Sequence, residues 1–218
     1  MSSLRHNVVD REPRDAYLDA ARDCILDVGW RRTTLTEVAR RAGVSRMTIY
    51  RTWADMPTLL GDLMTREWAA VVTEHVTEHA TEHVTEHATE HVGGADGLAS
   101  GRQVIKRLAE GIVGTVRQLR ANELFVRIVE LDPELILPYL FSRRGRSQEL
   151  ILSITTRAIA EGQRSGEVRE GNPVAIARGL LLAAHGFVLS VHTMVDDDAS
   201  EAELDGELTL LIERTLRV

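Results

Sequence analysis

Six arginines lie between residues 31 and 53, and their side chains could bind nucleic acid. A guanidinium group donates paired hydrogen bonds to a phosphate or to the O6 and N7 edge of guanine. The same stretch holds one acidic residue, Glu37, so its formal charge is +5, whereas the whole chain carries −7. A small basic unit on an acidic body predicts contact with phosphates at one end of the molecule. The alternative is that the arginines merely solvate two surface helices, which is common for scattered charges but fits this spacing poorly.

Two short helices separated by a glycine-containing turn are predicted around these arginines. Thr34 and Glu37 fit the S/T-x-x-E capping box, so a helix can begin directly after Thr34. Gly43 can take the left-handed backbone that ends this helix. Ser45 is a good N-cap for a second helix over residues 46–53.

The second helix would bury one face and expose the other. Ile49 and Trp53 lie one turn apart and would face inward, toward a first helix over residues 13–28. Two short helices joined in this way indicate a helix-turn-helix. The side chains left to face outward are Arg46, Met47, Thr48, Tyr50 and Arg51.

This stretch closely resembles the TetR family of bacterial transcriptional regulators. The resemblance covers about a quarter of the chain, and members of that family carry a helical body after it. The chain departs from the pattern at Met56, where a phosphate-contacting lysine is usual, and at Met47, where a small residue is common. The residues that match are Thr33, Thr34, Val38, Ala39, Ala42, Gly43, Val44, Ser45, Thr48, Ile49, Tyr50, Trp53, Asp55, Leu59 and Leu60.

The resemblance implies roles for individual residues. Thr34 and the N-terminus of the second helix would hold a phosphate, and Tyr50 would hydrogen-bond the DNA backbone. Met47 could contact a thymine methyl group. Two such helices on a homodimer would read a near-palindromic operator, and the family association favours a repressor over an activator. The residues facing the groove would be Arg46, Met47, Thr48 and Arg51.

Composition predicts an all-α protein without catalytic equipment. Of the 218 residues, 44% are hydrophobic and 27% charged, which is ordinary for a globular protein. Cys24 is the single cysteine, so we expect a core residue and no disulfide within the chain. No membrane-spanning stretch, signal peptide, nucleophile motif, P-loop or dinucleotide fingerprint is found. We therefore expect a cytoplasmic protein that is not an enzyme and needs no cofactor.

Three regions are expected: a flexible arm over residues 1–12, a helix-turn-helix head over 13–54 and a helical body over 55–218. Helices of the body are predicted at residues 103–119, 123–131, 134–141 (capped by Asp132), 147–162, 173–193 and 200–217. The helix over 173–193 is apolar all round and must be buried on both sides. Similar proteins dimerise through their last long helices as a four-helix bundle, which implies a homodimer through 147–165 and 173–193.

The resemblance also implies a small-molecule effector that binds inside the helical body and releases the DNA. Few charges are available for the interior, so we expect an apolar or amphipathic effector. Aromatic residues at helical spacing are usually core, and His185 on an apolar helix is more often a hydrogen-bonded core residue than a ligand contact. The candidates for the effector pocket are Trp68, Phe125, Tyr139, Phe141, His185, Phe187 and His192.

Residues 73–92 are five copies of a four-residue unit, TEHV or TEHA. We expect them to extend a fourth helix, which begins near Met56, into solvent or to form a partly disordered loop. Histidines at i and i+4 can share a metal, and the repeat contains H-x-x-E-H, a zinc-enzyme signature. The repeat generates this signature automatically, so we predict no metal site; a metal-responsive regulator is the second interpretation and a metalloenzyme the third. The weak metal candidates are His75, His79, His83, His87 and His91.

Overall fold

The structure, a computed structural model, describes residues 13–68 and 103–218. Every regular element within these ranges is a helix, so the expected all-α class is confirmed. The arm expected over residues 1–12 and the repeat over 73–92 lie outside the described residues. The named elements are α1 (Pro13–Val28), η1 (Trp30–Arg32), α2 (Leu35–Arg41), α3 (Arg46–Thr52), α6 (Gln103–Ala121), α7 (Glu123–Leu131), η2 (Pro133–Leu135), α8 (Leu137–Phe141), α9 (Arg146–Ser165), α10 (Pro173–Leu189), η3 (Val191–Thr193) and α11 (Glu201–Leu216).

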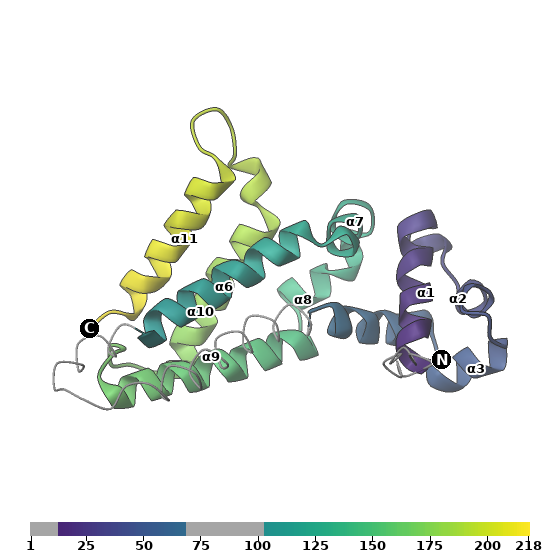
Figure 1. Ribbon diagram of the computed structural model, residues 1–218, viewed down its shortest axis with the longest axis horizontal. Coiled ribbons are helices and arrows are strands. Elements are labelled where there is room, and N and C mark those ends of the chain that lie inside the picture. Colours follow the sequence, from purple (N-terminus) through teal and green to yellow (C-terminus); the bar gives the residue numbers. More distant parts are fainter. Residues whose placement is uncertain (1–12, 69–102) are drawn as a thin grey trace, which may run out of the picture.

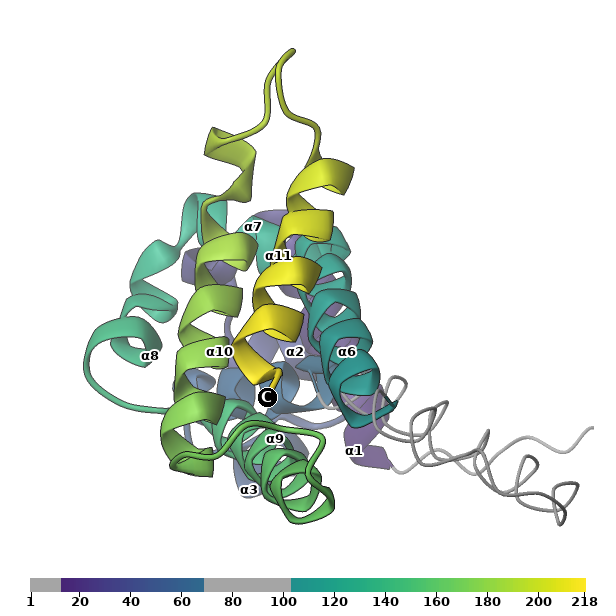
Figure 2. The same ribbon diagram turned by 90° about the vertical axis from the view of Figure 1, so that its left-hand side faces the viewer.

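The molecule is elongated, with a small head of α1, α2 and α3 at one end and a larger body at the other (Figure 1). Residues 56–68 form a further helix, the connecting helix, which leads from the head toward the body. The body packs α6, α9, α10 and α11 together, and Figure 2 shows α8 at the outer edge of this bundle. In Figure 1 α7 lies between the body and the head.

The head has an apolar core formed where α1 packs on the helix-turn-helix. Ala21 and Ile25 of α1 are fully buried, as are Val38 of α2 and Ile49 of α3. Cys24 lies in the same cluster as a free, buried thiol, as expected. Burial raises the pKa of this thiol, so the side chain behaves as a small apolar residue.

The core of the head continues beyond residue 54. Leu59 and Leu63 of the connecting helix and Leu124 and Ile128 of α7 are buried in the same cluster as the helices of the head. The helix-turn-helix, the connecting helix and α7 therefore share one apolar core, although α3 ends at Thr52 and α7 begins only at Glu123.

A second core holds the body together. It joins α6, α9, α10 and α11 through buried aliphatic side chains such as Val113, Ile159, Leu180 and Ile212. The side chain of Asn172 caps α10 by accepting hydrogen bonds from the next turn, and Pro173 takes the first helical position, as predicted. Residue Gly166, with φ of 80°, ends α9 in the left-handed conformation.

A buried carboxylate ties α11 to α6. Asp205 is 3% exposed and accepts hydrogen bonds from Arg120 Nη2 at 2.7 Å and from Arg117 Nε at 2.6 Å. The Arg120 side chain is itself buried and also pairs with the exposed Glu201 at 3.0 Å. A buried charge requires partners of this kind, because it has lost its hydration.

Three predicted elements differ from what the structure shows. The helix expected over 173–193 ends at Leu189, and residues 191–193 form a separate 3-10 turn. The helix expected over 134–141 is divided into η2 and α8. Asp132 does not cap it; the carboxylate is buried and accepts from the backbone N–H of Trp30 at 3.3 Å. A tertiary partner in the head has replaced the local capping role.

Candidate DNA interface and effector cavity

The turn between α2 and α3 is fixed by local hydrogen bonds. Thr34 caps α2 by accepting from the N–H of Glu37 at 3.2 Å, and Ser45 caps α3 by accepting from the N–H of Thr48 at 3.2 Å. Gly43 has φ of 68°, in the left-handed region that favours glycine. The expected capping box is only half formed, because the Glu37 carboxylate accepts from Arg40 and not from Thr34.

The orientation of α3 depends on two buried residues, Ile49 and Trp53, and on a hydrogen bond from the Trp53 indole. Ile49 and Trp53 are buried as predicted. The indole N–H of Trp53 donates to Asp62 Oδ2 in the connecting helix at 2.7 Å, and the ring of Tyr17 meets the Trp53 ring edge-on at 6.4 Å. These contacts attach the end of α3 to both α1 and the connecting helix.

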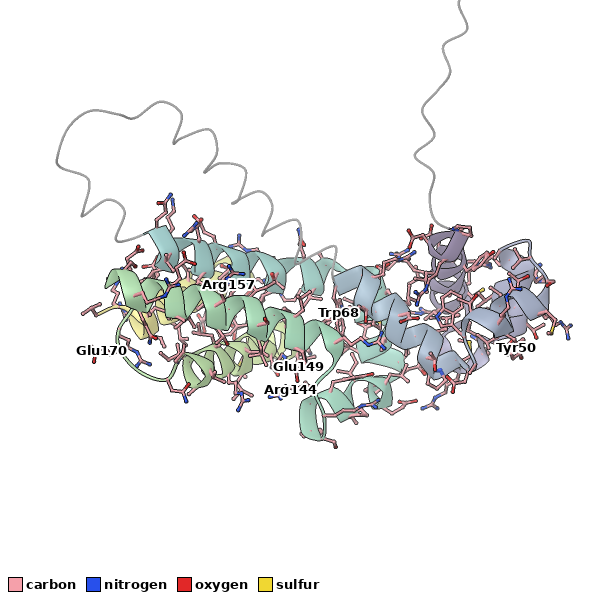
Figure 3. All side chains as sticks on the ribbon, turned by 90° about the horizontal axis from the view of Figure 1, so that it is seen from below. Tyr50, Trp68, Arg144, Glu149, Arg157 and Glu170 are labelled. Atoms are coloured by element: carbon pink, nitrogen blue, oxygen red, sulfur yellow. The ribbon has the colours of Figure 1, made fainter. Side chains whose placement is uncertain are left out.

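The opposite face of α3 is open to solvent. Arg46, Met47, Tyr50 and Arg51 are exposed, with Met47 at 76%. Thr48 is half-buried, and its hydroxyl lies 2.9 Å from the Ser45 hydroxyl. Figure 3 shows Tyr50 at the outer end of the head, far from Trp68. The structure thus places the five expected side chains on one short helix at the tip of the molecule.

The arginines of the head divide into two groups by their partners. Of the six between residues 31 and 53, three are paired with acids: Arg31 with Glu134, Arg40 with Glu37 and Arg41 with Asp27. In each case the hydrogen bond that the arginine donates to the carboxylate raises the pKa of the arginine. Within the described ranges Arg46 and Arg51 have no acidic partner, so both arginines of α3 keep an uncompensated positive charge. Arg32 Nε donates to the carbonyl of Val28 at 2.7 Å.

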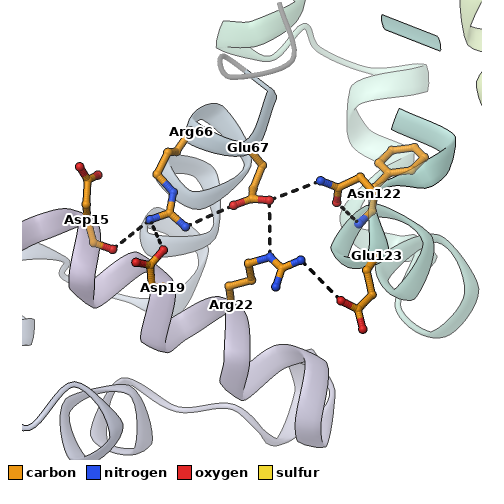
Figure 4. A network of polar contacts seen from close by, with 8 residues as sticks. Asp15, Asp19, Arg22, Arg66, Glu67, Asn122 and Glu123 are labelled. Carbon is orange, nitrogen blue, oxygen red and sulfur yellow. Dashed lines mark hydrogen bonds and ion pairs between the residues drawn. The ribbon is translucent and has the colours of Figure 1, made fainter. Parts of the chain in front are cut away.

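A network of charged groups joins α1 to the end of the connecting helix (Figure 4). Arg66 donates from Nη1 to the backbone carbonyl of Asp15 at 2.9 Å, pairs with Asp19 Oδ1 at 2.9 Å, and contacts Glu67 with Nη2 at 3.2 Å. Each of these groups is at least partly shielded from solvent. The last described turn of the connecting helix is therefore attached to the head through its side chains.

Glu67 extends this network into the body (Figure 4). Its Oε2 lies 3.6 Å from Arg22 Nε on α1 and accepts from Asn122 Nδ2 at 3.4 Å. Asn122 is the N-cap of α7, where its Oδ1 accepts from the N–H of Phe125 at 2.9 Å. Arg22 also pairs with Glu123 at 3.5 Å. Glu67 is thus the shared partner of α1 and α7.

A second polar joint connects η1 of the head with the end of α7. Arg31 donates to Glu134 Oε1 from Nη2 at 2.8 Å and from Nε at 3.1 Å, and its Nε lies 3.4 Å from Asp132 Oδ1. The other oxygen of Asp132 accepts from the N–H of Trp30. No local sequence pattern indicated this joint, because its two sides are about a hundred residues apart.

The body contains a largely apolar cavity of about 350 Å³. Its wall is formed by α6, α9 and α10, with further residues from the connecting helix, α7 and α8. A cavity of this size is at the lower end of the range typical of small-molecule sites. Four of the seven expected pocket residues line it, namely Trp68, Phe125, Tyr139 and His185.

The other three expected pocket residues lie outside the cavity wall. Phe141 is 79% exposed at the end of the five-residue α8. Phe187 packs against the core of the body, and His192 is exposed in η3, beyond the end of α10. Helical periodicity did not place His192 correctly, because α10 ends at Leu189, before it.

Gln148 and His185 form a polar pair in the cavity wall, and Gln148 was not anticipated from the sequence. Gln148 Oε1 accepts from the N–H of Gly145 at 2.8 Å, and Nε2 donates to the carbonyl of Tyr139 at 3.3 Å. The same Nε2 lies 3.3 Å from Nε2 of His185. Burial lowers the pKa of His185, so the imidazole is neutral at neutral pH.

Neither a metal site nor a membrane span is found in the part of the chain that the structure describes. Within 13–68 and 103–218, no three His, Cys, Asp or Glu side chains gather closely enough to hold a metal ion. No helix in those ranges is both long and apolar enough to cross a membrane. The histidines of the repeat, His75 to His91, lie outside the described residues.

Comparison with known proteins agrees with this architecture. The family described as "Bacterial regulatory proteins, tetR family" matches residues 18–63. An uncharacterized HTH-type transcriptional regulator of Mycobacterium bovis is 33% identical over 209 residues, which cover 96% of each chain. The fatty acid degradation regulator FadR from Bacillus halodurans has the same fold, with a TM-score of 0.61, 17% identity and coverage of 92% of this chain and 94% of that chain. FadR from Bacillus subtilis, solved in complex with stearoyl-CoA, gives a TM-score of 0.60 at 18% identity and covers 93% and 99%. This chain therefore belongs to the TetR family of helix-turn-helix transcriptional regulators.

Proposed function

We propose that the protein is a dimeric repressor that binds a near-palindromic operator through α3 and leaves it when a small molecule enters the body. The observation that carries the DNA part is the exposed outer face of α3, where Arg46 and Arg51 lack acidic partners among the described residues. Arg31, Arg40 and Arg41, in contrast, are each paired with an acid. Because its partner is chromosomal DNA, the protein would act in the cytoplasm.

The five outward-facing side chains of α3 would contact different groups of the DNA. Arg46 and Arg51 would reach guanine edges or phosphates, and Met47 would contact a thymine methyl group. Tyr50 would hydrogen-bond the DNA backbone. Thr34 is the N-cap of α2, and Thr48 lies in the first turn of α3. Free backbone N–H groups at these helix starts favour a phosphate.

An exposed face of α9 and α10 supports the homodimer. Leu182 is 70% exposed in the middle of α10, Val174 is 40% exposed, and Leu150 of α9 is 45% exposed. These two helices pack against each other in the chain, so their exposed side chains can form one surface. A second copy would cover it and would set the distance between two α3 helices.

The cavity supports a response to a small molecule, because it reaches the connecting helix. Trp68 lines the cavity, and the preceding residue, Glu67, contacts both Arg22 of α1 and Asn122 of α7. A ligand that shifts Trp68 therefore acts on the joint that positions the head. The apolar wall fits an apolar or amphipathic effector.

A mobility-shift assay on the DNA upstream of the protein's own gene tests the recognition helix. Arg46→Ala should weaken binding by about fivefold to 150-fold, since a lost base contact costs about 1–3 kcal/mol. If Arg46 binds a phosphate, the slope of log K against log salt should also fall by about 1. Tyr50→Phe should weaken binding without changing thermal unfolding.

Arg214→Ala is the matched control, because Arg214 is exposed on α11, away from the head (Figure 1). It removes the same charge and should leave operator affinity unchanged. Equal affinities of Arg46→Ala and Arg214→Ala for the operator would contradict the assignment of α3 as the recognition helix.

A further inference from the structure

The cavity wall holds a buried hydrogen-bond donor without an acceptor. The indole N–H of Trp68 is shielded from solvent, and no described residue accepts a hydrogen bond from it. The ring itself is held edge-on against Phe125 at 6.2 Å. An unsatisfied buried donor destabilises a fold. Native proteins therefore rarely keep one unless a bound molecule accepts its hydrogen bond.

His185 supplies a second donor, as the hydrogen bonds of Gln148 show. Because Gly145 donates to Oε1 of Gln148, the amide nitrogen of Gln148 must be the atom that faces His185. That nitrogen has two hydrogens, and one is donated to the carbonyl of Tyr139. The other points to Nε2 of His185, which must therefore be the unprotonated acceptor.

The neutral imidazole consequently carries its proton on Nδ1. No hydrogen bond from this Nδ1–H is found among the described residues, and His185 lines the cavity. Two ring N–H groups, from Trp68 and from His185, are thus available to a bound molecule. Each is a donor and neither can accept.

Ser147, Thr155 and Tyr139 add hydroxyl groups to the residues of the wall, and a hydroxyl can either donate or accept. The hydroxyl of Thr115 donates to the carbonyl of Gly111 at 2.8 Å, within its own helix. The charged lining residues are Arg107 of α6 and Glu161 of α9, which have opposite signs. The wall as a whole therefore has no net charge to attract an ionic ligand.

We infer that the cavity selects uncharged, mainly apolar molecules that carry a hydrogen-bond acceptor, such as a ketone or ester carbonyl, held by the ring N–H groups of Trp68 and His185. This inference rests on the proposed function, because it names the class of effector. Selection follows from energetics: a ligand without an acceptor leaves the donors unpaired, whereas a carbonyl compound satisfies them.

Three probes with one carbon skeleton separate this inference from simple apolar binding. Benzophenone has a carbonyl acceptor, benzhydrol has a hydroxyl that both donates and accepts, and diphenylmethane has neither. In a cavity without polar recognition the most apolar probe, diphenylmethane, binds best. Calorimetry on the full-length protein, without DNA, should instead show benzophenone binding at least about tenfold more tightly than diphenylmethane, with benzhydrol between them.

Substitutions assign the preference to the two rings. Trp68→Phe and His185→Phe keep an aromatic ring but remove its N–H, and each should reduce the preference for benzophenone by about threefold to tenfold. Trp30→Phe and His192→Phe are matched controls, since neither residue lines the cavity, and both should keep the wild-type preference. Circular dichroism establishes that each variant is folded before binding is measured.

The inference is overturned if wild-type protein binds diphenylmethane as tightly as benzophenone, if both cavity variants keep the full preference, or if none of the probes binds. Operator binding without any probe is measured in parallel. A protein that binds its operator normally but prefers diphenylmethane refutes only the ligand class. A protein that binds no operator refutes the proposed function itself.

Discussion

Replacement of Asp205 by alanine should cost far more stability than removal of the exposed carboxylate of Glu201, which pairs with the same arginine between α6 and α11. The carboxylate is 3% exposed and neutralises Arg120, whose side chain is 8% exposed. Without Asp205 the guanidinium keeps one acidic neighbour, the 57% exposed Glu201. Its Nε already has no hydrogen-bond partner among the described residues.

The magnitude follows from these contacts. Removal of one partner from a buried ion pair costs about 3–5 kcal/mol, because the other charge remains buried. The pair of Asp205 with Arg117, which is 58% exposed, adds little. Alanine is a better helix former than aspartate by at most about 0.7 kcal/mol, which offsets part of the loss. We therefore expect Asp205→Ala to lower the free energy of unfolding by about 2–4 kcal/mol.

Urea unfolding followed by circular dichroism, at one fixed protein concentration, measures this change. Glu201→Ala is the matched control: it removes a carboxylate from the same guanidinium at an exposed site and should cost about 0–1 kcal/mol. A double change of Arg120 and Asp205 to leucine should be less harmful than Asp205→Ala alone, since it leaves no buried charge. If Asp205→Ala and Glu201→Ala are equally stable, the reasoning from burial is refuted.

Three further predictions concern packing, assembly and pH. Gly162→Ala should destabilise the body, because a Cβ there would lie 2.5 Å from a methyl group of Val168; Gly206→Ala, with nothing within 4 Å, should stabilise α11 by up to about 1 kcal/mol in the same unfolding assay. Leu182→Glu should convert the dimer to a monomer in sedimentation velocity and weaken operator binding, and a dimer of unchanged affinity would exclude α10 from the interface. Burial lowers the pKa of His185, so the folded protein takes up this proton less readily than the unfolded chain. Stability from the neutral ring is thus full above about pH 6.5 and is lost as the pH falls below it; between about pH 7.5 and 5.5 His185→Gln should lose less stability than wild type.

The elements that were predicted correctly depend on residues close together in sequence. Thr34 and Ser45 each accept a hydrogen bond from the backbone N–H three residues later. Asn172 caps α10 by accepting from the N–H groups two and three residues later. Gly43 takes a backbone conformation that few other residues adopt. Such signals need no knowledge of the tertiary fold, so the helix-turn-helix and the start of α10 could be placed from sequence alone.

The features that were missed depend on partners far apart in sequence. Asp132 precedes a proline and looks like a helix cap, but its acceptor role is toward Trp30, 102 residues earlier. Gln148 looks like a surface residue near the start of a helix, yet it is buried and orients His185. Phe141 has the residue type of a pocket wall but lies on a five-residue helix that exposes it. In each case the sequence shows the type of the residue but not the direction in which its side chain points.

The location of the cavity gives a physical reason for coupling between ligand and DNA. Leu124 and Ile128 belong to the apolar core of the head, so α7 and the connecting helix should move with the head. Trp68 and Phe125, from these same two helices, form one part of the cavity wall, and residues of α6, α9 and α10 form the rest. The cavity therefore lies at the boundary between the unit that carries α3 and the bundle that would form the dimer. A molecule that fills it must press on both, and the two α3 helices of a dimer would then change their separation without any rearrangement inside the helix-turn-helix.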